Sequence, residues 1–347
     1  MSHKPASFAA VSTIGIDLGK NIFHLVGLDQ RGAIVLQLKC SRAQLERRLA
    51  NIPSCLIGME ACSGAHYIAR QLAALGHDVR LIPAQYVKPF LKGHKNDYRD
   101  AEAIAEAVQR PTMHFVAIKT PEQMDLLALH RVRSHLVGQR TGGTNQIRGF
   151  LIKRGIIVRQ GVVPLRKALP DILSSNTQAL SPRMVNLITE LVQDWRRLDE
   201  RVAAVSAEIE SLAEQDEACQ RAMTVPGIGP INLERRGGGD RQWRRLHART
   251  RLRRVAGTRT KAGIDRRSHD PGQDLQARQH VQAAHVVLAR RPSAAMRSLW
   301  PWIERASRRL HRNMLAIALA NKLARIAWAV LARGHAYEPK VAADAAS

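Results

Sequence analysis

The chain has few acidic residues, no paired cysteines and no long apolar run. Its 29 Asp and Glu residues stand against 54 Lys and Arg, which leaves a net charge of +25 over 347 residues. Such an excess favours a polyanionic partner, because each neutralised phosphate releases counterions and strengthens binding. Nucleic acid is therefore the leading partner class, and a solubilising surface is the alternative interpretation.

Two further absences narrow the class of protein. The cysteines show no CxxC or Cys/His spacing of the kind that a structural zinc ion needs, so we expect reduced thiols. They are Cys40, Cys55, Cys62 and Cys219. The N-terminus has no apolar core for a signal peptide, and the apolar stretch 313–333 is interrupted by Lys322 and Arg325. We expect a soluble cytoplasmic protein that does not enter a membrane.

The first hundred residues predict a mixed α/β sheet. Three apolar runs between about residues 12 and 39, VSTIGID, IFHLVGLD and AIVLQLK, are separated by turn residues and predict a strand meander. A helix that opens on Ser41, the strand SCLIGME, the helix GAHYIARQLAALG and the strand DVRLIPA follow in order. This alternation predicts a sheet with crossover helices.

From residue 120 the pattern becomes helical. Residues 120–152 are mostly helical in pattern, although Gly142 and Gly143 should weaken the middle. Between residues 188 and 212, apolar residues alternate steps of three and four, which predicts a coiled-coil helix that pairs within the chain or with a second chain. These residues are Ile188, Leu191, Trp195, Leu198, Val202, Val205, Ile209 and Leu212. The last apolar helix, near residues 310–334, should be buried.

Four carboxylates form the candidate site. Asp17 and Glu60 end two predicted strands, where side chains can converge and hold Mg²⁺. Asp97 and Asp100 lie three residues apart at the start of a predicted helix and should face one side. Each has a plainer interpretation, since an Asp there can be an N-cap and a strand-end carboxylate can be solvated. Their combination favours a metal site that works on phosphodiesters.

Long motifs now indicate a family. The segments IGIDLGKNIFHL, MEACSGAHYIARQL, LIPAQYVKPFLKGHKNDYRDAEAIAEAV and LHRVRSHLVGQR resemble the DEDD insertion-sequence transposases of the IS-one-ten group. The resemblance covers roughly residues 10–231 and resumes from about 281 to 335. It departs from the family pattern at Tyr98 and Arg99, where small residues are usual, and at Gly142 and Gly143.

The resemblance implies a RuvC-like, RNase H-like domain with Asp17, Glu60, Asp97 and Asp100 as its catalytic, Mg²⁺- or Mn²⁺-binding tetrad. It also implies a dimerising coiled coil, a C-terminal domain with a nucleophilic serine, DNA as substrate and a bridge RNA as guide. We expect a homodimer or homotetramer associated with the nucleoid in the cytoplasm. The expected divisions are a catalytic domain at 10–118, a helical region at 119–218, a C-terminal domain at 219–335 and a disordered tail at 336–347.

One block does not fit this family. Residues 232–280 contain 13 arginines and few regularly spaced aliphatic residues, which indicates either a basic arm that folds on nucleic acid or a frameshift. Residues 258–279 admit codons that, read one nucleotide later, give LVPKQESTGGRTILGKISKRG. That reading resembles the family's serine segment.

The serine codon of the shifted reading would straddle Ile264 and Asp265, so neither residue is the nucleophile. Ser268 belongs to the shifted frame and is not assigned that role. We therefore expect a copy that keeps the metal site and loses serine chemistry, with the block disordered and the C-terminal domain poorly packed.

The remaining signals concern nucleic acid and one rival class. Lys20, Lys92 and Lys95 are candidates for phosphate contact or plain surface lysines. Gly227 and Gly229 in TVPGIGPI fit either a helix-hairpin-helix that approaches a DNA phosphate or a simple turn. IGIDLGK also resembles the first phosphate loop of actin-like ATPases, but a second Asp-Gly-Gly loop is absent outside the shifted block. A non-catalytic nucleic-acid-binding protein is the third hypothesis.

Overall fold

A computed structural model describes residues 10–93, 96–174, 179–233 and 299–338. The chain divides into two compact units, Met1–Pro121 and Glu122–Ser347, which are considered separately below. Lys95 and nearly all of the block 232–280 lie outside the described residues, as does most of the expected tail. The frameshift hypothesis and the expected disorder therefore stay predictions.

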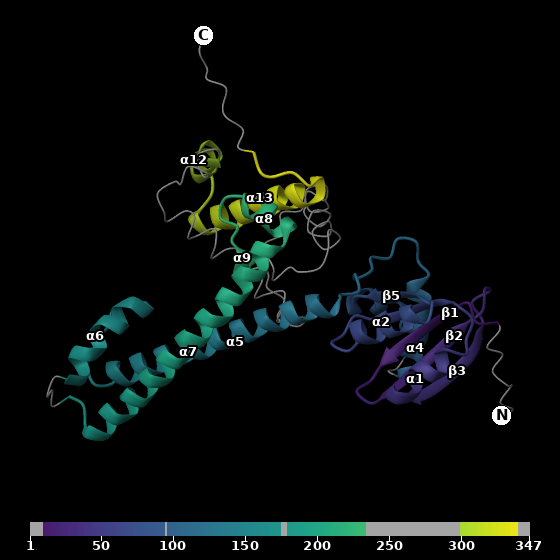
Figure 1. Cartoon of the computed structure of the whole chain (residues 1–347), viewed down its shortest axis with the longest axis horizontal. Helices are drawn as coiled ribbons and strands as arrows, with labels where there is room; N and C mark the ends of the chain where they lie inside the picture. The colour runs from purple at the N-terminus through teal and green to yellow at the C-terminus, as the bar shows by residue number, and fades with distance from the viewer. Residues whose placement is uncertain (1–9, 94–95, 175–178, 234–298, 339–347) are drawn as a thin grey trace, which may run out of the picture. The chain divides into compact units, whose positions relative to one another are not determined.

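The first unit is a mixed sheet with helices on both faces (Figure 1). Its strands lie in the order β3-β2-β1-β4-β5, with β1, β2 and β3 antiparallel and β1, β4 and β5 parallel. The predicted meander and the crossover helices are thus confirmed, and the architecture is consistent with an RNase H-like domain. The strands are β1 (Thr13–Leu18), β2 (Ile22–Leu28), β3 (Ile34–Ser41), β4 (Leu56–Glu60) and β5 (Asp78–Ile82). The helices are α1 (Arg42–Leu49), α2 (Ala65–Ala74), α3 (Ala84–Val87), the 3₁₀ helix η2 (Lys88–Phe90) and α4 (Asp97–Val108).

Three layers result from the alternation of side chains along the strands. On one face, Ile14 and Ile16 of β1 share a fully buried core with residues of α1 and α2, including Leu49 and Leu72. On the other face α4 packs against β1, β2 and β4, and its Ala101 and Ala105 share a cluster with Val26 of β2. The face of the sheet that α4 covers is the face that carries the site.

The second unit begins with three helices, α5 (Pro121–Ile152), α6 (Val162–Ser174) and α7 (Pro182–Gln215). The Arg133 Nε donates to Ser206 Oγ at 2.7 Å, and Arg140 pairs with Asp199 at 3.1 Å, so α5 and α7 run antiparallel. Gly142 and Gly143 do not interrupt α5, which runs through both, and the expected weakening of its middle stays a prediction. The helix continues because Thr144 and Ile147, immediately beyond those glycines, are buried.

The buried stripe of α7 agrees only partly with the predicted seam. The predicted residues that lie seven apart, Ile188, Trp195, Val202 and Ile209, are buried. The predicted residues between them are not among the buried ones. The buried residues are Ile188, Val192, Trp195, Val202, Ile209 and Ala213. Leu212 is instead 39% exposed. The stripe is displaced by one residue at Val192 and at Ala213, and its first half packs on residues of α5 and α6 of the same chain.

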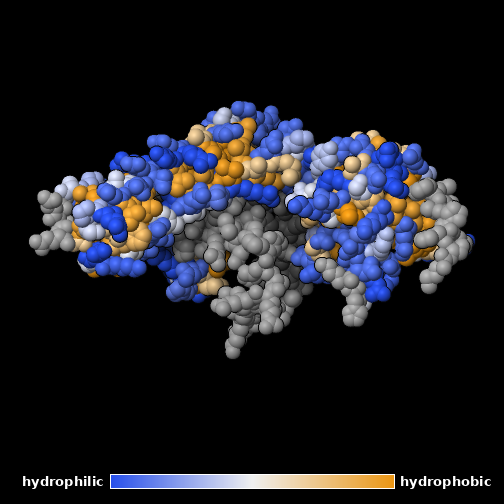
Figure 2. Space-filling view, turned by 90° about the horizontal axis from the view of Figure 1, so that it is seen from below, coloured by the Kyte–Doolittle hydropathy of each residue, from blue (hydrophilic) through white to orange (hydrophobic). Residues whose placement is uncertain are grey.

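The end of the chain forms a separate core of α8 (Glu217–Met223), α12 (Trp300–Ser307) and α13 (Arg312–Arg333). The described helices share a core in which Ile303, Ala316 and Leu319 are buried. The expected poor packing of the whole C-terminal domain involves residues outside the described ones and stays a prediction. Among the described residues, α13 is the one helix long and apolar enough to cross a membrane, although its Lys322 ammonium lies 5.0 Å from the Trp302 ring centre. Figure 2 shows patches of hydrophobic residues within a largely hydrophilic visible surface.

Candidate metal centre

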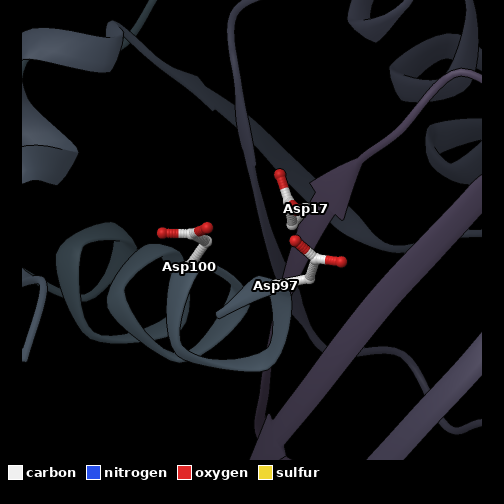
Figure 3. Close-up of side chains that lie close together, drawn as sticks. All are labelled: Asp17, Asp97 and Asp100. Carbon is white, nitrogen blue, oxygen red and sulfur yellow. The ribbon is translucent and has the colours of Figure 1, made fainter. Parts of the chain in front are cut away.

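Three of the four predicted carboxylates converge. Asp17 at the end of β1 and Asp97 and Asp100 in the first turn of α4 each offer an oxygen, and these oxygens all lie within 4.8 Å of one another. Figure 3 shows the two helix residues on the side of α4 that faces the end of β1. Glu60 is not within this group, but it lines the same pocket of roughly 370 Å³.

The strand register explains the meeting of Asp17 and Glu60. Gly15 and Gly58 are direct partners on the parallel strands β1 and β4. Because side chains alternate, the residues two positions further on, Asp17 and Glu60, point to the same face as those glycines. An added Cβ at Gly15 would lie 2.0 Å from the Ala101 carbonyl oxygen of α4. The shared face is therefore the face that α4 covers.

The alternative interpretation of the helix aspartates as N-caps is excluded. Asn96 is the N-cap of α4, and its side chain accepts the backbone N–H of Tyr98 at 3.0 Å. Asp97 and Asp100 follow in the first turn, where the helix dipole favours negative charge. Their carboxylates are thus directed to the pocket instead of to the helix end.

The electrostatics of the pocket show crowding of negative charge. Burial raises the pKa of Glu60, and the carboxylates of Asp17 and Asp100 raise it further. Lys88 of η2, which lines the same pocket, acts in the opposite direction on the pKa of Glu60. A cation bound among these groups would relieve the repulsion.

His24 is a neighbour of the site that the sequence did not reveal. Its Nδ1 lies 3.5 Å from Oδ2 of Asp97, and its side chain is only 12% exposed. The ring packs edge-on against Tyr98 at 4.9 Å. The strand register places His24 opposite Asp17 on β2, and this cross-strand pairing is the signal that could have found it.

The lysine candidates have different surroundings. The Lys92 ammonium pairs with Glu106 at 2.6 Å and Glu102 at 3.5 Å, and its hydrogen bond to Glu106 raises the pKa of Lys92. Lys20 is exposed in the turn after β1, where its backbone carbonyl accepts from Arg42. Neither lysine lines the acidic pocket.

The glycine pair of the predicted hairpin lies between two helices. Gly227 has a φ of +80°, in the turn that leads from α8 to α9 (Pro230–Leu233). Val225 of the turn is buried, and the N–H of Ile228 donates to its carbonyl at 3.1 Å. A Cβ at Gly229 would meet nothing within 4 Å, so that residue leaves open space beside the backbone.

The donor set fits hard divalent cations, which prefer carboxylate oxygens and take six or more ligands. The four carboxylates supply oxygens from two strands and one helix, and the pocket has room for water as well. The fold and this pocket define the class of protein: an α/β domain with a candidate divalent-metal site at the carboxyl ends of its parallel strands.

Comparison with known proteins gives the family. A sequence model of the DEDD transposase family of IS110 type, described as a transposase, matches residues 14–153. The transposase for insertion sequence element IS1328 from Yersinia enterocolitica is 40% identical over 336 residues, which cover 93% of this chain and 98% of that protein. A probable family 20 transposase from Pseudomonas aeruginosa is 36% identical, with 95% and 99% covered. The transposase for element IS1111A of Coxiella burnetii is 32% identical, with 95% and 92% covered. The chain belongs to the IS110-type DEDD transposases.

Proposed function

We propose that this transposase cuts and joins DNA with divalent cations held by Asp17, Glu60, Asp97 and Asp100. The observation that carries the proposal is the approach of three carboxylate oxygens to within 4.8 Å from a strand and a helix, in one pocket with Glu60. Transposases act on DNA, and the net charge of +25 suits a polyanionic substrate.

The protein's own groups have distinct tasks in this proposal. Asp17 and Glu60 present oxygens from rigid strands, while Asp97 and Asp100 close the ligand set from α4. Mg²⁺ or Mn²⁺ bound there would activate an attacking oxygen and stabilise a leaving oxygen. His24 beside Asp97 would help to orient that ligand, and the positive charge of Lys88 acts on Glu60.

Asp17→Ala tests the proposal. We expect the variant to lose Mn²⁺ binding in calorimetric titration and to lose any metal-dependent DNA cleavage or strand exchange. Asp194→Asn on α7, an exposed carboxylate outside the pocket, is the matched control and should bind Mn²⁺ as the unaltered chain does. If Asp17→Ala binds Mn²⁺ and acts on DNA as well as the unaltered chain does, the proposed metal site is refuted.

The partners in the proposal are element ends, target DNA and a bridge RNA, in a homodimer or homotetramer. The family resemblance and the apolar stripe of α7 support this assembly, since exposed Leu187 and Leu212 flank the buried residues. Sequencing of RNA that copurifies with the chain, and light scattering with and without that RNA, would test both parts.

The proposed divisions remain a catalytic domain at 10–118, a helical dimerising region at 119–218 and a C-terminal domain at 219–335. We place the protein in the cytoplasm with the nucleoid. The apolar helix α13 is then the core of the C-terminal domain, supported by its buried contacts with α8 and α12. Fractionation that recovers the chain in membranes would contradict this assignment.

A second candidate function is a nucleic-acid-binding remnant without strand-joining activity. The observation that favours it is the Arg-rich block, whose shifted reading restores a serine segment. The two relatives align with this chain over nearly the full length of both proteins. An added basic arm would make this chain longer than its relatives, so the similar lengths support two compensating frameshifts. A remnant would bind Mn²⁺ and DNA but would not exchange strands.

A further inference from the structure

We infer that Lys88 is the residue that contacts the phosphate of the DNA at the reacting site, a role for which the sequence offered Lys20, Lys92 and Lys95. The inference rests on the proposed function. It follows from the position of Lys88 in the acidic pocket, from the freedom of its ammonium and from the charge that the site must balance.

The position comes first. Lys88 lies in η2, directly after β5 and α3, and among the described residues that line the pocket it alone carries a positive charge. Its charge is close enough to act on Glu60. A DNA phosphate that reaches the carboxylates must therefore approach this ammonium.

The segment that carries Lys88 is anchored. The preceding Val87 is only 4% exposed and belongs to a core cluster with Ile82 and Ile104. The carbonyl of Lys88 accepts the N–H of Leu91 at 3.2 Å, which closes the 3₁₀ turn. The backbone is thus held while the side chain stays exposed, an arrangement that suits a group that must reach a ligand.

The ammonium of Lys88 is available for a ligand. In the part of the chain that the structure describes, its side chain makes no ion pair or hydrogen bond. Lys92, only four residues later, is instead held by Glu106 and Glu102. Lys92 could contact a phosphate only after its ion pairs with Glu106 and Glu102 were broken. Lys88 would not have to break an ion pair.

The charge of the site also needs one cation from the protein. With two divalent ions bound, the four carboxylates would be balanced, and the phosphodiester would add one negative charge. One ammonium restores neutrality in a pocket with apolar walls of Val87, Leu91 and Ile104. Lysine suits this task because it binds phosphate as a compact point charge.

The test compares Lys88→Ala with Lys92→Ala in the full chain, with a random-sequence DNA duplex as the probe. Ca²⁺ replaces Mg²⁺ so that the DNA stays intact, and parallel titrations contain EDTA. With Ca²⁺, Lys88→Ala should weaken binding about tenfold and reduce the slope of log affinity against log salt by about one. In EDTA it should differ little from the unaltered chain, because the carboxylates then hold no divalent ion and repel the phosphate.

Lys92→Ala should match the unaltered chain in both media. Equal binding of Lys88→Ala and the unaltered chain in Ca²⁺ would overturn the inference. Equal weakening by both variants would overturn it too, because that result reports only the overall charge.

Mn²⁺ titration separates this inference from the proposed function. Lys88→Ala, or Lys88→Met if the alanine variant is unfolded, should bind Mn²⁺ at least as tightly as the unaltered chain, since a repelling charge is removed. Loss of Mn²⁺ binding in a folded Lys88→Met would show that Lys88 holds the pocket together and would overturn its assignment to phosphate. Failure of the unaltered chain to bind Mn²⁺ would instead overturn the proposed function.

Discussion

Gly15 of β1 faces the Ala101 carbonyl of α4 so closely that a methyl group on Gly15 would lie 2.0 Å from that oxygen. The partner glycine on β4, Gly58, faces Val108 of the same helix, where an added Cβ would be 2.8 Å from the Val108 Cβ. Two glycines in register thus let a helix lie directly on two strands. This close approach brings the first turn of α4 to the strand ends that carry Asp17 and Glu60.

Gly15→Ala should therefore damage both the fold and the site. The added methyl group would meet the Ala101 backbone carbonyl, which cannot rotate away as a side chain can, so α4 must move. We expect the first unit to lose about 1–3 kcal/mol of stability and to bind Mn²⁺ more weakly. Hydrogen exchange of β1 and α4 amides, together with Mn²⁺ titration, would measure this. Gly142→Ala is the matched control, because an added Cβ there meets nothing within 4 Å inside a helix and should stabilise α5 by about 0.5–1 kcal/mol. Unchanged protection in Gly15→Ala would refute the steric argument.

A second prediction concerns pH and the segment that follows the sheet. His66 of α2 accepts the backbone N–H of Lys119 at 3.2 Å, and Arg70 donates to the Lys119 carbonyl. Burial lowers the pKa of His66 from 6.5 to about 4, with help from the charges of Lys119 and Arg70. Between these values the unfolded chain binds a proton that the folded chain does not, so stability is complete above pH 6.5 and falls toward pH 4.

The loss attributable to His66 is at most about 3 kcal/mol across that window. His66→Gln keeps a hydrogen-bond acceptor and cannot titrate, so its pH dependence should be flatter when urea midpoints are compared at pH 7.5 and pH 5. Parallel curves for the two proteins would rule out His66 as the titrating group.

A third prediction concerns the helical unit. The Asp199 carboxylate accepts Arg140 at 3.1 Å and also pairs with Arg166, and its side chain is 23% exposed. Asp199→Ala would leave the Arg140 guanidinium, whose side chain is 27% exposed, without its anion, and would also remove the partner of the more exposed Arg166. We expect urea denaturation to show a loss of about 1–3 kcal/mol in this unit. Asp194→Ala removes the exposed pair with Arg197 and should change stability by less than about 0.5 kcal/mol. Equal effects would mean that the Asp199 network contributes no more than a surface pair.

A fourth prediction tests the gene. Sequencing through codons 225–285 should recover the nucleotides that encode LVPKQESTGGRTILGKISKRG in the next frame. A chain with that reading restored should gain strand exchange, while Ser268→Ala in the present chain should change nothing. Codons incompatible with the shifted reading would end the frameshift hypothesis.

Much of the first unit could be predicted from local patterns. The strand runs, the capping position of Ser41 and the order of elements are short-range signals, and the structure has each of them. The convergence of the acids was also foreseeable. The sequence contains Gly15-Ile16-Asp17 and Gly58-Met59-Glu60, two copies of one spacing, and the glycine two residues before each acid was the unused signal.

Other features depend on contacts that no local pattern contains. The sequence does not distinguish Lys88 from Lys92. Only the position of α4 in the fold shows that Glu102 and Glu106 pair with Lys92. Gly142 and Gly143 predict a weak helix, but burial of Ile147 on neighbouring helices offsets their low helix propensity. The seam of α7 shifted for the same reason, because its actual neighbours decide which side chains are buried.

All four carboxylates lie between residues 17 and 100, within the unit that ends at Pro121. The hypothesised frameshift lies beyond residue 231 and would therefore leave every ligand of the candidate metal site untouched. We expect such a chain to occupy element ends without completing their transfer. In a cell that also holds an intact copy, it would act as a competitor, and the damaged gene would restrain the spread of its own relatives.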